Sequence, residues 1–440
     1  MENLFYLLNF SVSGIKNIEK EVQLNFYKKT VDKDFDPERY RIKAIYGENG
    51  SGKSAIITAV KIFQDLMLSD NYLSESKNQG FLDEIVNKTT HIFKFSCEFL
   101  VNDDSDKSIY NYSVHIGKNE KGLYEIQYEI LKTKNGNYAN QRYRTIFECR
   151  NGELAYINCA DDQKGIIEKK TANLLSAHSM IYLYIINLKK EDMTDKGLLF
   201  DILPSIVFVL TLNVYIAEED QHELYFLQKT MRNKGFEDQK LITGIFELED
   251  YYNIFSNVSE RRVNKEYFVK YREKVGQLTQ FIKIFKPDLV SIDIDAKENG
   301  EYYICNLNLN YADYSINQEF ESTGIKKLIR LYDCFVSAGK GGIVFIDELD
   351  SNLNDVYLCK MLEYFMYYGK GQMCFTTHNL DPMSVLKANR NSIEFLSSDN
   401  HLVTWTAKGN ASPENYYKNG MIEDSPFNID ASDFVGILGE

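Results

Sequence analysis

The chain has 440 residues, of which 44% are hydrophobic and 26% charged, and 50 basic against 64 acidic residues give it a net charge of −14. This length fits two or three domains, or one large domain with an insertion. The acidic balance argues against a protein that is covered by nucleic acid on all sides. It is still compatible with a local basic groove that binds nucleic acid.

Seven cysteines are scattered along the chain, and no two of them have C-x-x-C spacing. This usage predicts reduced, buried thiols in a cytoplasmic protein. The N-terminal segment MENLFYLLNF lacks the basic-then-apolar layout of a signal peptide, so we do not expect secretion.

The first recognisable feature is a glycine-rich turn between a short strand and a helix. Ile42–Tyr46 is an apolar run typical of a buried strand, and the pattern after the turn has helical spacing. An anion bound in the turn would also face the N-terminus of that helix, whose dipole favours negative charge. The helical stripe consists of Ile56, Val60, Phe63 and Met67.

The turn itself, GENGSGKS, matches the phosphate-loop pattern G-x-x-x-x-G-K-[ST] completely. Glycines let main-chain N–H groups fold around phosphate oxygens, where a Cβ would clash. Lys53 supplies a charge to the β and γ phosphates, and the Ser54 hydroxyl is a ligand for Mg²⁺. The predicted nucleotide-binding residues are Gly47, Asn49, Gly50, Ser51, Gly52, Lys53 and Ser54.

Residues 92–158 alternate apolar and polar side chains in several short runs. Turn signals such as NDDSD and KNGN separate the runs. This pattern predicts an antiparallel meander of strands.

Residues 166–286 are mostly helical in pattern and lack the sustained heptads of a coiled coil, which predicts a compact helical insertion. Its most apolar stretch, Leu198–Ile216, contains Asp201, Pro204 and Asn213. We therefore expect a buried helix or a partner-facing surface there, and no membrane span.

A basic and aromatic stretch, SERRVNKEYFVKYREK, occupies Ser259–Lys274. Basic residues interleaved with Tyr267, Phe268 and Tyr271 are compatible with a nucleic-acid contact. A solvated helix face with an apolar side is the simpler interpretation, and we prefer it. The basic residues are Arg261, Arg262, Lys265, Lys270, Arg272 and Lys274.

Two predicted strands of a hairpin, within Lys286–Tyr311, precede a buried strand that ends in carboxylates. Ile343–Ile346 is a continuous apolar run, as a central parallel strand is, and Asp347 and Glu348 follow it. We expect Asp347 to hold Mg²⁺ through water, which is the Walker B role. Glu348 is then placed to polarise the attacking water as a general base. A solvated acidic turn is the alternative.

Another short buried strand is predicted at Met373–Phe375, and His378 follows it, 31 positions after Asp347 (from 347 to 378). A helix over Val356–Tyr368 would connect the two strands. Ligands of open α/β sheets gather at the carboxyl ends of the strands. We therefore expect His378 to reach the γ-phosphate or the attacking water, the alternative being an ordinary surface histidine.

A large insertion splits the nucleotide-binding motifs, because Asp347 lies 293 positions after Ser54 (from 54 to 347). Shortly before the Walker B strand, Ser322, Gly324 and Lys326 open a helical pattern in EFESTGIKKLIRLYDCF. A serine cap followed by a glycine exposes N–H groups to an anion. A plain serine-capped helix start is the alternative interpretation.

These motifs and their spacing resemble those of the ABC-type head ATPases, which include the SMC proteins, double-strand-break repair ATPases and bacterial phage-defence ATPases. The segment STGIK resembles the S-x-G-x-K/R signature of the SMC-like and defence branch, and it does not match the transporter form LSGGQ. The resemblance covers residues 1–165 and 287–400. It implies an α/β fold of the P-loop NTPase class with an antiparallel β-lobe.

The resemblance also implies that two copies bind head to tail. Each ATP would lie between the phosphate loop of one copy and the signature residues Ser322, Gly324 and Lys326 of the other. His378 then resembles the switch histidine. Asn354 stands at the D-loop position and departs from the usual Asp or His-Pro, and Gln127 is a candidate for the Q-loop glutamine.

The expected organisation has four parts: an N-terminal half of the ATPase head (1–165), the helical insertion (166–286), a C-terminal half of the head (287–400) and a tail (401–440). The tail from Asn415 is either a docking segment or packs on its own core. Because 62 residues follow His378 (from 378 to 440), we do not expect the nuclease domain that OLD-type defence enzymes append there.

By this resemblance we expect a cytoplasmic ATPase of the abortive-infection and phage-defence family, using ATP and Mg²⁺. It would bind itself as a dimer or higher oligomer and control a separate effector protein, such as a nuclease or toxin. One alternative is an SMC-like repair or recombination ATPase that acts on DNA. Another is a non-catalytic scaffold that holds ATP to build an assembly. Nucleic acid is a further possible partner, and we do not expect binding to a membrane.

Overall fold

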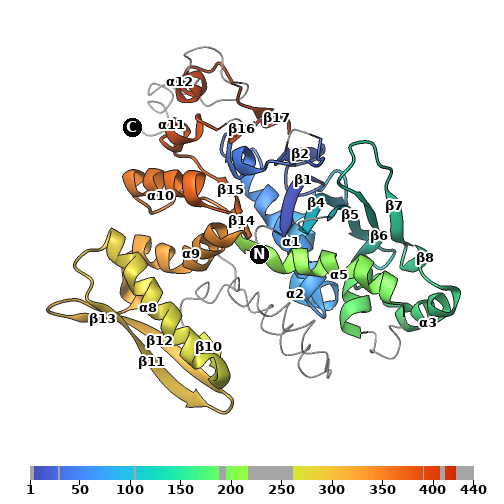
Figure 1. Ribbon diagram of the computed structural model, residues 1–440, viewed down its shortest axis with the longest axis horizontal. Helices are drawn as coiled ribbons and strands as arrows, with labels where there is room; N and C mark the ends of the chain where they lie inside the picture. Colours follow the sequence, from blue (N-terminus) through green and yellow to red (C-terminus); the bar gives the residue numbers. More distant parts are fainter. Residues whose placement is uncertain are drawn as a thin grey trace, which may run out of the picture.

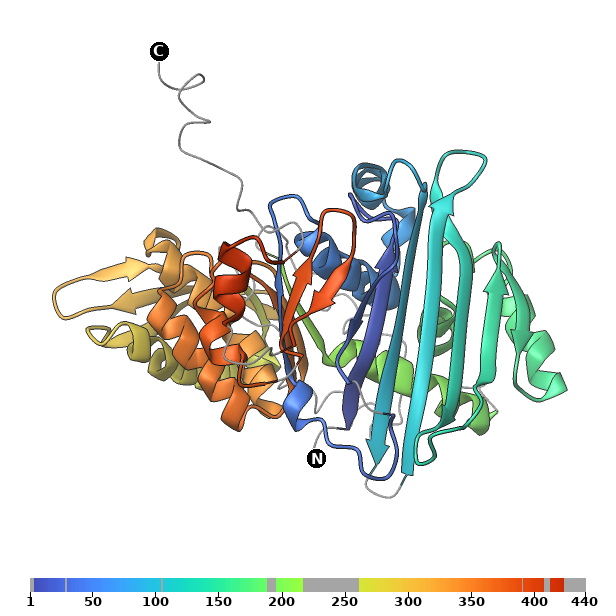
Figure 2. The same ribbon diagram turned by 90° about the horizontal axis from the view of Figure 1, so that it is seen from above.

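Two sheets organise the chain in the computed structural model (Figures 1 and 2). The antiparallel sheet lies on one side of the molecule in Figure 2, and a mainly parallel sheet with its helices lies on the other. The structure describes residues 4–27, 30–103, 106–187, 195–216, 261–389, 391–406 and 412–422.

The antiparallel sheet contains the predicted meander. Its strands β4 to β8 follow one another in chain order, which confirms the pattern predicted over residues 92–158. Two N-terminal strands that the sequence analysis did not identify continue the sheet beyond β4. In spatial order the strands are β2 (Val22–Asn25), β1 (Phe5–Ser13), β4 (Ile92–Asp103), β5 (Asp106–Lys118), β6 (Tyr124–Asn135), β7 (Arg144–Arg150) and β8 (Glu153–Ile157).

The second sheet holds the strands that flank the predicted site. Adjacent strands of this sheet pair in parallel, except β16 and β17, which pair antiparallel. The order places β15 between β3 and β14. In spatial order the strands are β17 (Leu402–Thr404), β16 (Ile393–Leu396), β3 (Ile42–Tyr46), β15 (Gln372–Thr376), β14 (Ile343–Ile346) and β9 (Leu212–Tyr215).

The central strands of this sheet have a different core on each face. Ile45 of β3 packs with helix α1 and the antiparallel sheet, whereas Ala44 and Tyr46 pack with helices on the opposite side. In β14, Phe345 likewise packs on the side of helix α1 and the antiparallel sheet, and Val344 packs on the opposite side. Because successive side chains of a strand point to opposite faces, a strand buried on both faces reads as an unbroken apolar run. This is why the sequence predicted the bounds of β3 and β14.

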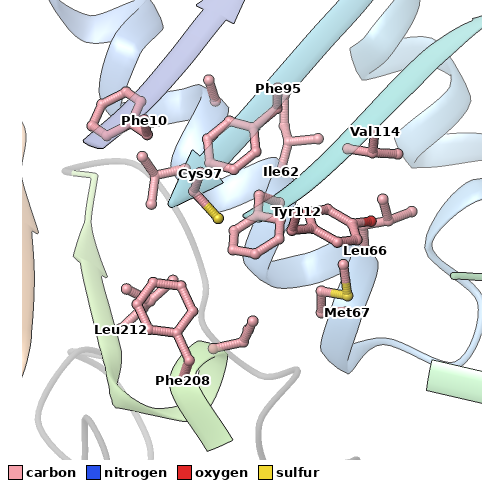
Figure 3. Close-up of a cluster of buried hydrophobic side chains, with 14 of the residues drawn as sticks. Phe10, Ile62, Leu66, Met67, Phe95, Cys97, Tyr112, Val114, Phe208 and Leu212 are labelled. Carbon is pink, nitrogen blue, oxygen red and sulfur yellow. The ribbon is translucent and has the colours of Figure 1, made fainter. Parts of the chain in front are cut away.

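Helix α1 (Lys53–Leu68) lies in the core shared by the two sheets. Every residue of this helix except Ser54 is buried, so the helix is covered on all sides and not only along its predicted stripe. Figure 3 shows Ile62, Leu66 and Met67 of α1 beside Phe95 and Tyr112 of the antiparallel sheet. A helix that is packed on all sides therefore comes directly after the phosphate-loop residues in the chain.

The other face of the parallel sheet is covered by helices from the C-terminal part of the chain (yellow to red in Figure 1). The predicted connection over Val356–Tyr368 is confirmed as a helix that begins one residue earlier. The helices are α8 (Phe268–Phe285), α9 (Thr323–Lys340), α10 (Asp355–Tyr368), α11 (Pro382–Leu386) and α12 (Pro413–Lys418).

A small separate sheet lies at one end of the molecule beside α8 (Figure 1). Its two long strands form the hairpin predicted within Lys286–Tyr311, which is therefore confirmed. The strands are β10 (Arg261–Asn264), β12 (Tyr302–Asn310), β11 (Ser291–Asn299) and, paired with β12, β13 (Ser315–Asn317).

Residues 166–286 are not purely helical where the structure describes them. The apolar stretch Leu198–Ile216 is a helix only as far as Thr211, after which β9 joins the parallel sheet beside β14. No described helix is long and apolar enough to span a membrane. Residues 217–260 of the expected insertion lie outside the described residues, and the four-part division stays a prediction. The helices before the gap are α3 (Asp161–Thr171), α4 (Met180–Tyr182), η3 (Leu183–Asn187) and α5 (Lys196–Thr211).

The described part of the tail packs on its own core. Tyr417 of α12 and Ile422 are buried in the same cluster as the parallel sheet, and the Tyr417 ring stacks on Phe395.

The remaining short elements lie elsewhere in the chain. They are η1 (Glu38–Tyr40), η2 (Tyr72–Ser74), α2 (Ser76–Ile85), η6 (Lys265–Tyr267) and η7 (Gln318–Phe320).

All seven cysteines lie in the described part of the chain, and each is a free thiol. Five are buried, and Cys159 and Cys359 are half-buried. Burial raises the pKa of the Cys374 thiol to about 12, so this sulfur stays protonated and unreactive at neutral pH.

Candidate nucleotide-binding site

The phosphate-loop pattern forms the connection from β3 to α1. Gly52, at the end of the loop, has φ +105°, and a Cβ there would lie 2.9 Å from Ile18 Cγ1. A Cβ on Gly47 would lie 2.4 Å from the carbonyl oxygen of Leu396. These two glycines therefore let the loop pack directly against Ile18 and Leu396, and Gly50, with φ +82°, has open space where its Cβ would be. A glycine loop of this kind fits phosphate oxygens held by main-chain N–H groups.

A turn near the N-terminus braces this loop. The Asn17 side-chain amide donates to the Gly50 carbonyl at 2.6 Å, and the Asn400 amide donates to the Asn17 carbonyl at 3.1 Å. Asn400 Oδ1 also accepts from the main-chain N–H of Glu19 at 2.9 Å. Sequence reasoning missed both asparagines, because their partners lie 33 and 383 positions away in the chain.

Lys53 is buried at the foot of the loop, with 6% of its surface exposed. Its ammonium donates to the carbonyls of Gly47 at 2.9 Å and Glu48 at 2.8 Å. Burial lowers the pKa of Lys53, while the charges of Asp347 and Glu348 act to raise it. The phosphate-loop lysine and the two Walker B carboxylates are therefore close enough to interact electrostatically, although the chain separates them widely.

The parallel strands explain this convergence. β15 pairs with β3 on one side and β14 on the other, so the carboxyl ends of all three strands meet at one edge of the sheet. The phosphate loop follows β3, Asp347 and Glu348 follow β14, and His378 follows β15 by two residues. The structure thus brings these four predicted features to the same edge.

Thr376, the last residue of β15, holds the Walker B carboxylates in place. Its hydroxyl donates to Asp347 Oδ1 at 2.5 Å and accepts from the main-chain N–H of Glu348 at 2.8 Å. Its carbonyl accepts from the N–H of Leu349 at 3.0 Å. Sequence reasoning missed Thr376, and the available signal was a hydroxyl residue at the end of the strand that leads to His378.

Glu348 has an unusual backbone conformation. Its φ is +49°, in the left-handed region that a side chain with a Cβ rarely adopts. Such a conformation costs roughly 1–3 kcal/mol and persists only where neighbouring contacts fix it. The side chain of Glu348 is exposed at the edge of the sheet, while Asp347 is half-buried. The strained turn therefore directs one carboxylate outward beside a second one that is held by Thr376.

His378 is exposed, as a residue that meets a ligand from solution needs to be. The segment around it is fixed on both sides. The N–H of Thr377 donates to the Ile45 carbonyl of β3 at 3.3 Å, and the Asn379 amide donates to Asp355 Oδ1 of α10 at 2.5 Å. His378 therefore projects from a well-anchored turn next to the phosphate loop.

The predicted signature residues lie elsewhere. Ser322 caps α9 by accepting from the N–H of Ile325 at 3.4 Å, and Lys326 donates to the Glu319 carbonyl at 3.2 Å. A Cβ on Gly324 would lie 2.7 Å from the carbonyl oxygen of Asn352, in the turn after β14. None of these described contacts is with residues 47–54, so the structure does not bring the signature residues to the phosphate loop of the same chain.

A neighbouring lysine, which sequence reasoning missed, contacts the Walker B turn. Lys327 is buried, and its ammonium donates to the Glu348 carbonyl and the Ser351 hydroxyl. Burial lowers its pKa to about 8, against the raising effect of Asp350, Glu348 and Asp347.

Two residues assigned by the resemblance have ordinary structural contacts. Asn354 caps α10, its side-chain oxygen accepting from the N–H of Val356 at 3.0 Å. Gln127 lies on β6 and donates to the Lys118 carbonyl at 3.2 Å, against Gly117 of β5. The contacts described for Gln127 lie within the antiparallel sheet, and nothing in them supports the Q-loop assignment.

Comparisons with known proteins say little about this chain. No family model matches it, and no curated protein does. Among solved structures, it is similar to one described as the recombination mediator protein RecF-ATPrS in the RecFOR pathway. That similarity has a TM-score of 0.36 and 15% sequence identity over 90% of this chain and 98% of the other. A similarity with a TM-score and an identity this low indicates nothing about function.

Proposed function

We propose that this chain is an ATP hydrolase of the ABC/SMC-head type. The observation that carries the proposal is the convergence of Lys53, in the glycine-rich loop after β3, with the adjacent carboxylates Asp347 and Glu348, which follow β14 at the same edge of the parallel sheet. Phosphoryl transfer needs this combination of a phosphate cradle, a fixed positive charge, a metal-binding carboxylate and a group that orients the attacking water.

Each residue at the site would have a separate role in binding or hydrolysis. The N–H groups of residues 47–54 and the Lys53 ammonium would hold the β and γ phosphates. Ser54 and Asp347 would hold Mg²⁺, which would supply positive charge to the phosphates. Glu348, exposed at the same edge, would accept a proton from the attacking water, and His378 would donate a hydrogen bond to the γ-phosphate.

Phosphate release from ATP by the purified chain tests this proposal. Lys53→Ala should abolish nucleotide binding, because it removes the cation that meets the phosphates. Retained affinity in Lys53→Ala would contradict the assignment of the cradle. Parallel measurements with ATP and GTP, with and without Mg²⁺, would identify the nucleotide and the need for the metal.

We also propose that a second copy completes the site. The support is geometric: the described contacts of Gly324 and Lys326 are with the turn after β14 and with η7, and Ser322 caps its own helix, so none of these contacts is with their own phosphate loop. Mixing Lys53→Ala with Ser322→Arg tests this arrangement, because a mixed head-to-tail dimer contains one intact site. We expect recovery of roughly a quarter of the wild-type activity if exchange is random. No recovery would place the whole site in one chain.

For the biological role we propose a sensor or scaffold of an anti-phage defence system that controls a separate nuclease or toxin. This proposal rests on the resemblance of its motifs, above all STGIK before the Walker B strand. Co-purification of the chain with the product of its neighbouring gene, and release of that product by ATP, is the test. A neighbouring gene that encodes neither a nuclease nor a toxin would count against it.

DNA repair is the second candidate, and the basic stretch at Ser259–Lys274 is what favours it. Several of its cations already have partners within the chain: Lys265 pairs with Glu298, the Lys270 ammonium lies 5.8 Å from the Tyr267 ring centre, and the Arg272 guanidinium lies 5.3 Å from the Phe268 ring centre. Salt-dependent DNA binding that Arg262→Ala weakens would support this role. Ser259 and Glu260 lie outside the described residues.

A further inference from the structure

The first turn of α9 is pressed against the turn that carries Glu348. Gly324 allows this approach, since a Cβ there would lie 2.7 Å from the Asn352 carbonyl oxygen. The Thr323 hydroxyl also donates to Asn352 Oδ1 at 3.4 Å. The helix that begins at Ser322 is therefore in direct contact with the residues that follow the Walker B strand.

Lys327 makes the deepest of these contacts. Three donors from two residues converge on the carbonyl of Glu348: the Lys327 ammonium, the N–H of Ser351 at 3.1 Å and the hydroxyl of Ser351 at 3.1 Å. The same ammonium donates to the Ser351 hydroxyl, which closes the network. The peptide that follows Glu348 is thus fixed by a lysine from a different helix.

This network explains how the left-handed backbone of Glu348 persists. A φ of +49° is unfavourable for glutamate, so the turn needs contacts that fix it. Thr376 holds the N–H of Glu348 at one end of the residue, and Lys327 holds its carbonyl at the other. Between these two points, the only freedom left to Glu348 is in its side chain.

The burial of Lys327 indicates that its positive charge has a role beyond filling space. A buried lysine is expensive to desolvate, and an apolar residue of similar volume usually serves stability as well or better. Lys327 is 6% exposed and faces Asp350, Glu348 and Asp347, which offset part of that cost. A buried charge that binds the carbonyl of Glu348 is explained by control of the position of that residue.

We propose that Lys327 is a positioning residue, which holds the peptide of Glu348 so that its carboxylate meets the attacking water and which links Ser322 at the start of α9 to that carboxylate. The proposal rests on the proposed ATPase function. Since Lys327 touches no reacting atom, it should affect turnover and leave nucleotide affinity unchanged. A displacement of α9 by a ligand at Ser322 would pass to Glu348 through this side chain, beside the contacts of Thr323 and Gly324 with Asn352.

Lys327→Met tests the proposal, because methionine fills a similar volume without the charge. We expect kcat to fall by about tenfold or more, while KM and the affinity for a non-hydrolysable ATP analogue stay within about threefold. The thermal midpoint should fall, because Lys327 also offsets the charges of Asp350, Glu348 and Asp347, so kcat is compared at a temperature at which both proteins are fully folded. Lys340→Met, an exposed lysine in the last turn of the same helix, is the matched control and should change neither quantity.

Ser351→Ala provides a second, milder variant. It should lower kcat by about two- to fivefold, and the double variant should be no slower than Lys327→Met alone, because both changes break the same network. If Lys327→Met does not fold, the kcat and KM of Ser351→Ala decide the matter.

A wild-type kcat in Lys327→Met, or a loss of affinity equal to the loss of turnover, would overturn the proposal. If the wild-type chain itself does not hydrolyse ATP, the proposed function fails and takes this inference with it. Turnover by the wild type with an unaffected Lys327→Met would refute the inference alone.

Discussion

Thr376 offers the sharpest test of how the two halves of the site are joined. Thr376→Val removes one hydroxyl and keeps the shape and β-branching of the side chain. The hydroxyl donates to Asp347 Oδ1 at 2.5 Å and accepts from the N–H of Glu348 at 2.8 Å. The substitution therefore releases the proposed metal ligand and the proposed base at the same time, without touching the phosphate loop.

The expected size follows from these two bonds. A hydrogen bond to a charged group contributes about 1.5–3 kcal/mol, and a donor left without a partner costs about 1–3 kcal/mol. Because the carboxylate of Asp347 is half-buried and regains some water, we expect a net loss of about 2–4 kcal/mol in the free energy of unfolding. Loss of a residue that orients a metal ligand typically costs about 10- to 100-fold in metal affinity or activity.

Urea denaturation and Mg²⁺-dependent phosphate release measure the two effects. Thr279→Val is the matched control, because its buried hydroxyl donates only within α8, to the Val275 carbonyl at 2.8 Å. This control should lose little stability and no activity. If Thr376→Val keeps both the urea midpoint and the Mg²⁺ dependence of the wild type, the bond network at the end of β15 does not organise the site.

Two further predictions concern buried charges outside the site. Burial raises the pKa of Glu129 to about 7 from an ordinary value of 4.5, so its contribution to stability is present below about pH 4.5 and is lost as the pH rises through 7. Between pH 5 and pH 8 the free energy of unfolding of the wild type, measured in urea, should therefore fall relative to that of Glu129→Gln by roughly 3 kcal/mol, and parallel pH profiles of the two proteins would contradict this. The buried pair Lys43 and Glu394 joins β3 to β16 beneath the phosphate loop. Lys43→Met should destabilise the chain by about 3–5 kcal/mol in urea and Lys43→Met with Glu394→Leu by much less, whereas equal losses would show that the pair is not coupled.

The secondary structure around the site was predictable where burial leaves a simple pattern. β3 and β14 are unbroken apolar runs because they are covered on both faces, and GENGSGKS between a strand and a helix permits few geometries. β9 was not predictable in the same way. Its four residues continue the apolar pattern of α5, and a short apolar run does not distinguish a helix from a strand.

The residues that organise the site were the harder part. Asp347, Glu348 and His378 follow predicted strands, so their approach to the phosphate loop could be inferred from the parallel sheet. Thr376 and Lys327 have no motif of their own, and their roles depend on partners 29 and 21 positions away that only the folded chain brings close. Contacts of this kind depend on tertiary packing, which composition and periodicity do not encode.

Glu348→Gln gives the most direct test of the central claim that this chain hydrolyses ATP with Glu348 as the base. The substitution keeps the size of the side chain and removes its ability to take a proton from water. We predict Mg²⁺-dependent phosphate release by the wild type and a fall in kcat of about 10²- to 10⁴-fold in Glu348→Gln, with ATP still bound. Equal turnover in the two proteins would show that Glu348 is not the base. Tight binding of ATP without turnover in the wild type would contradict the claim and leave a nucleotide-binding scaffold.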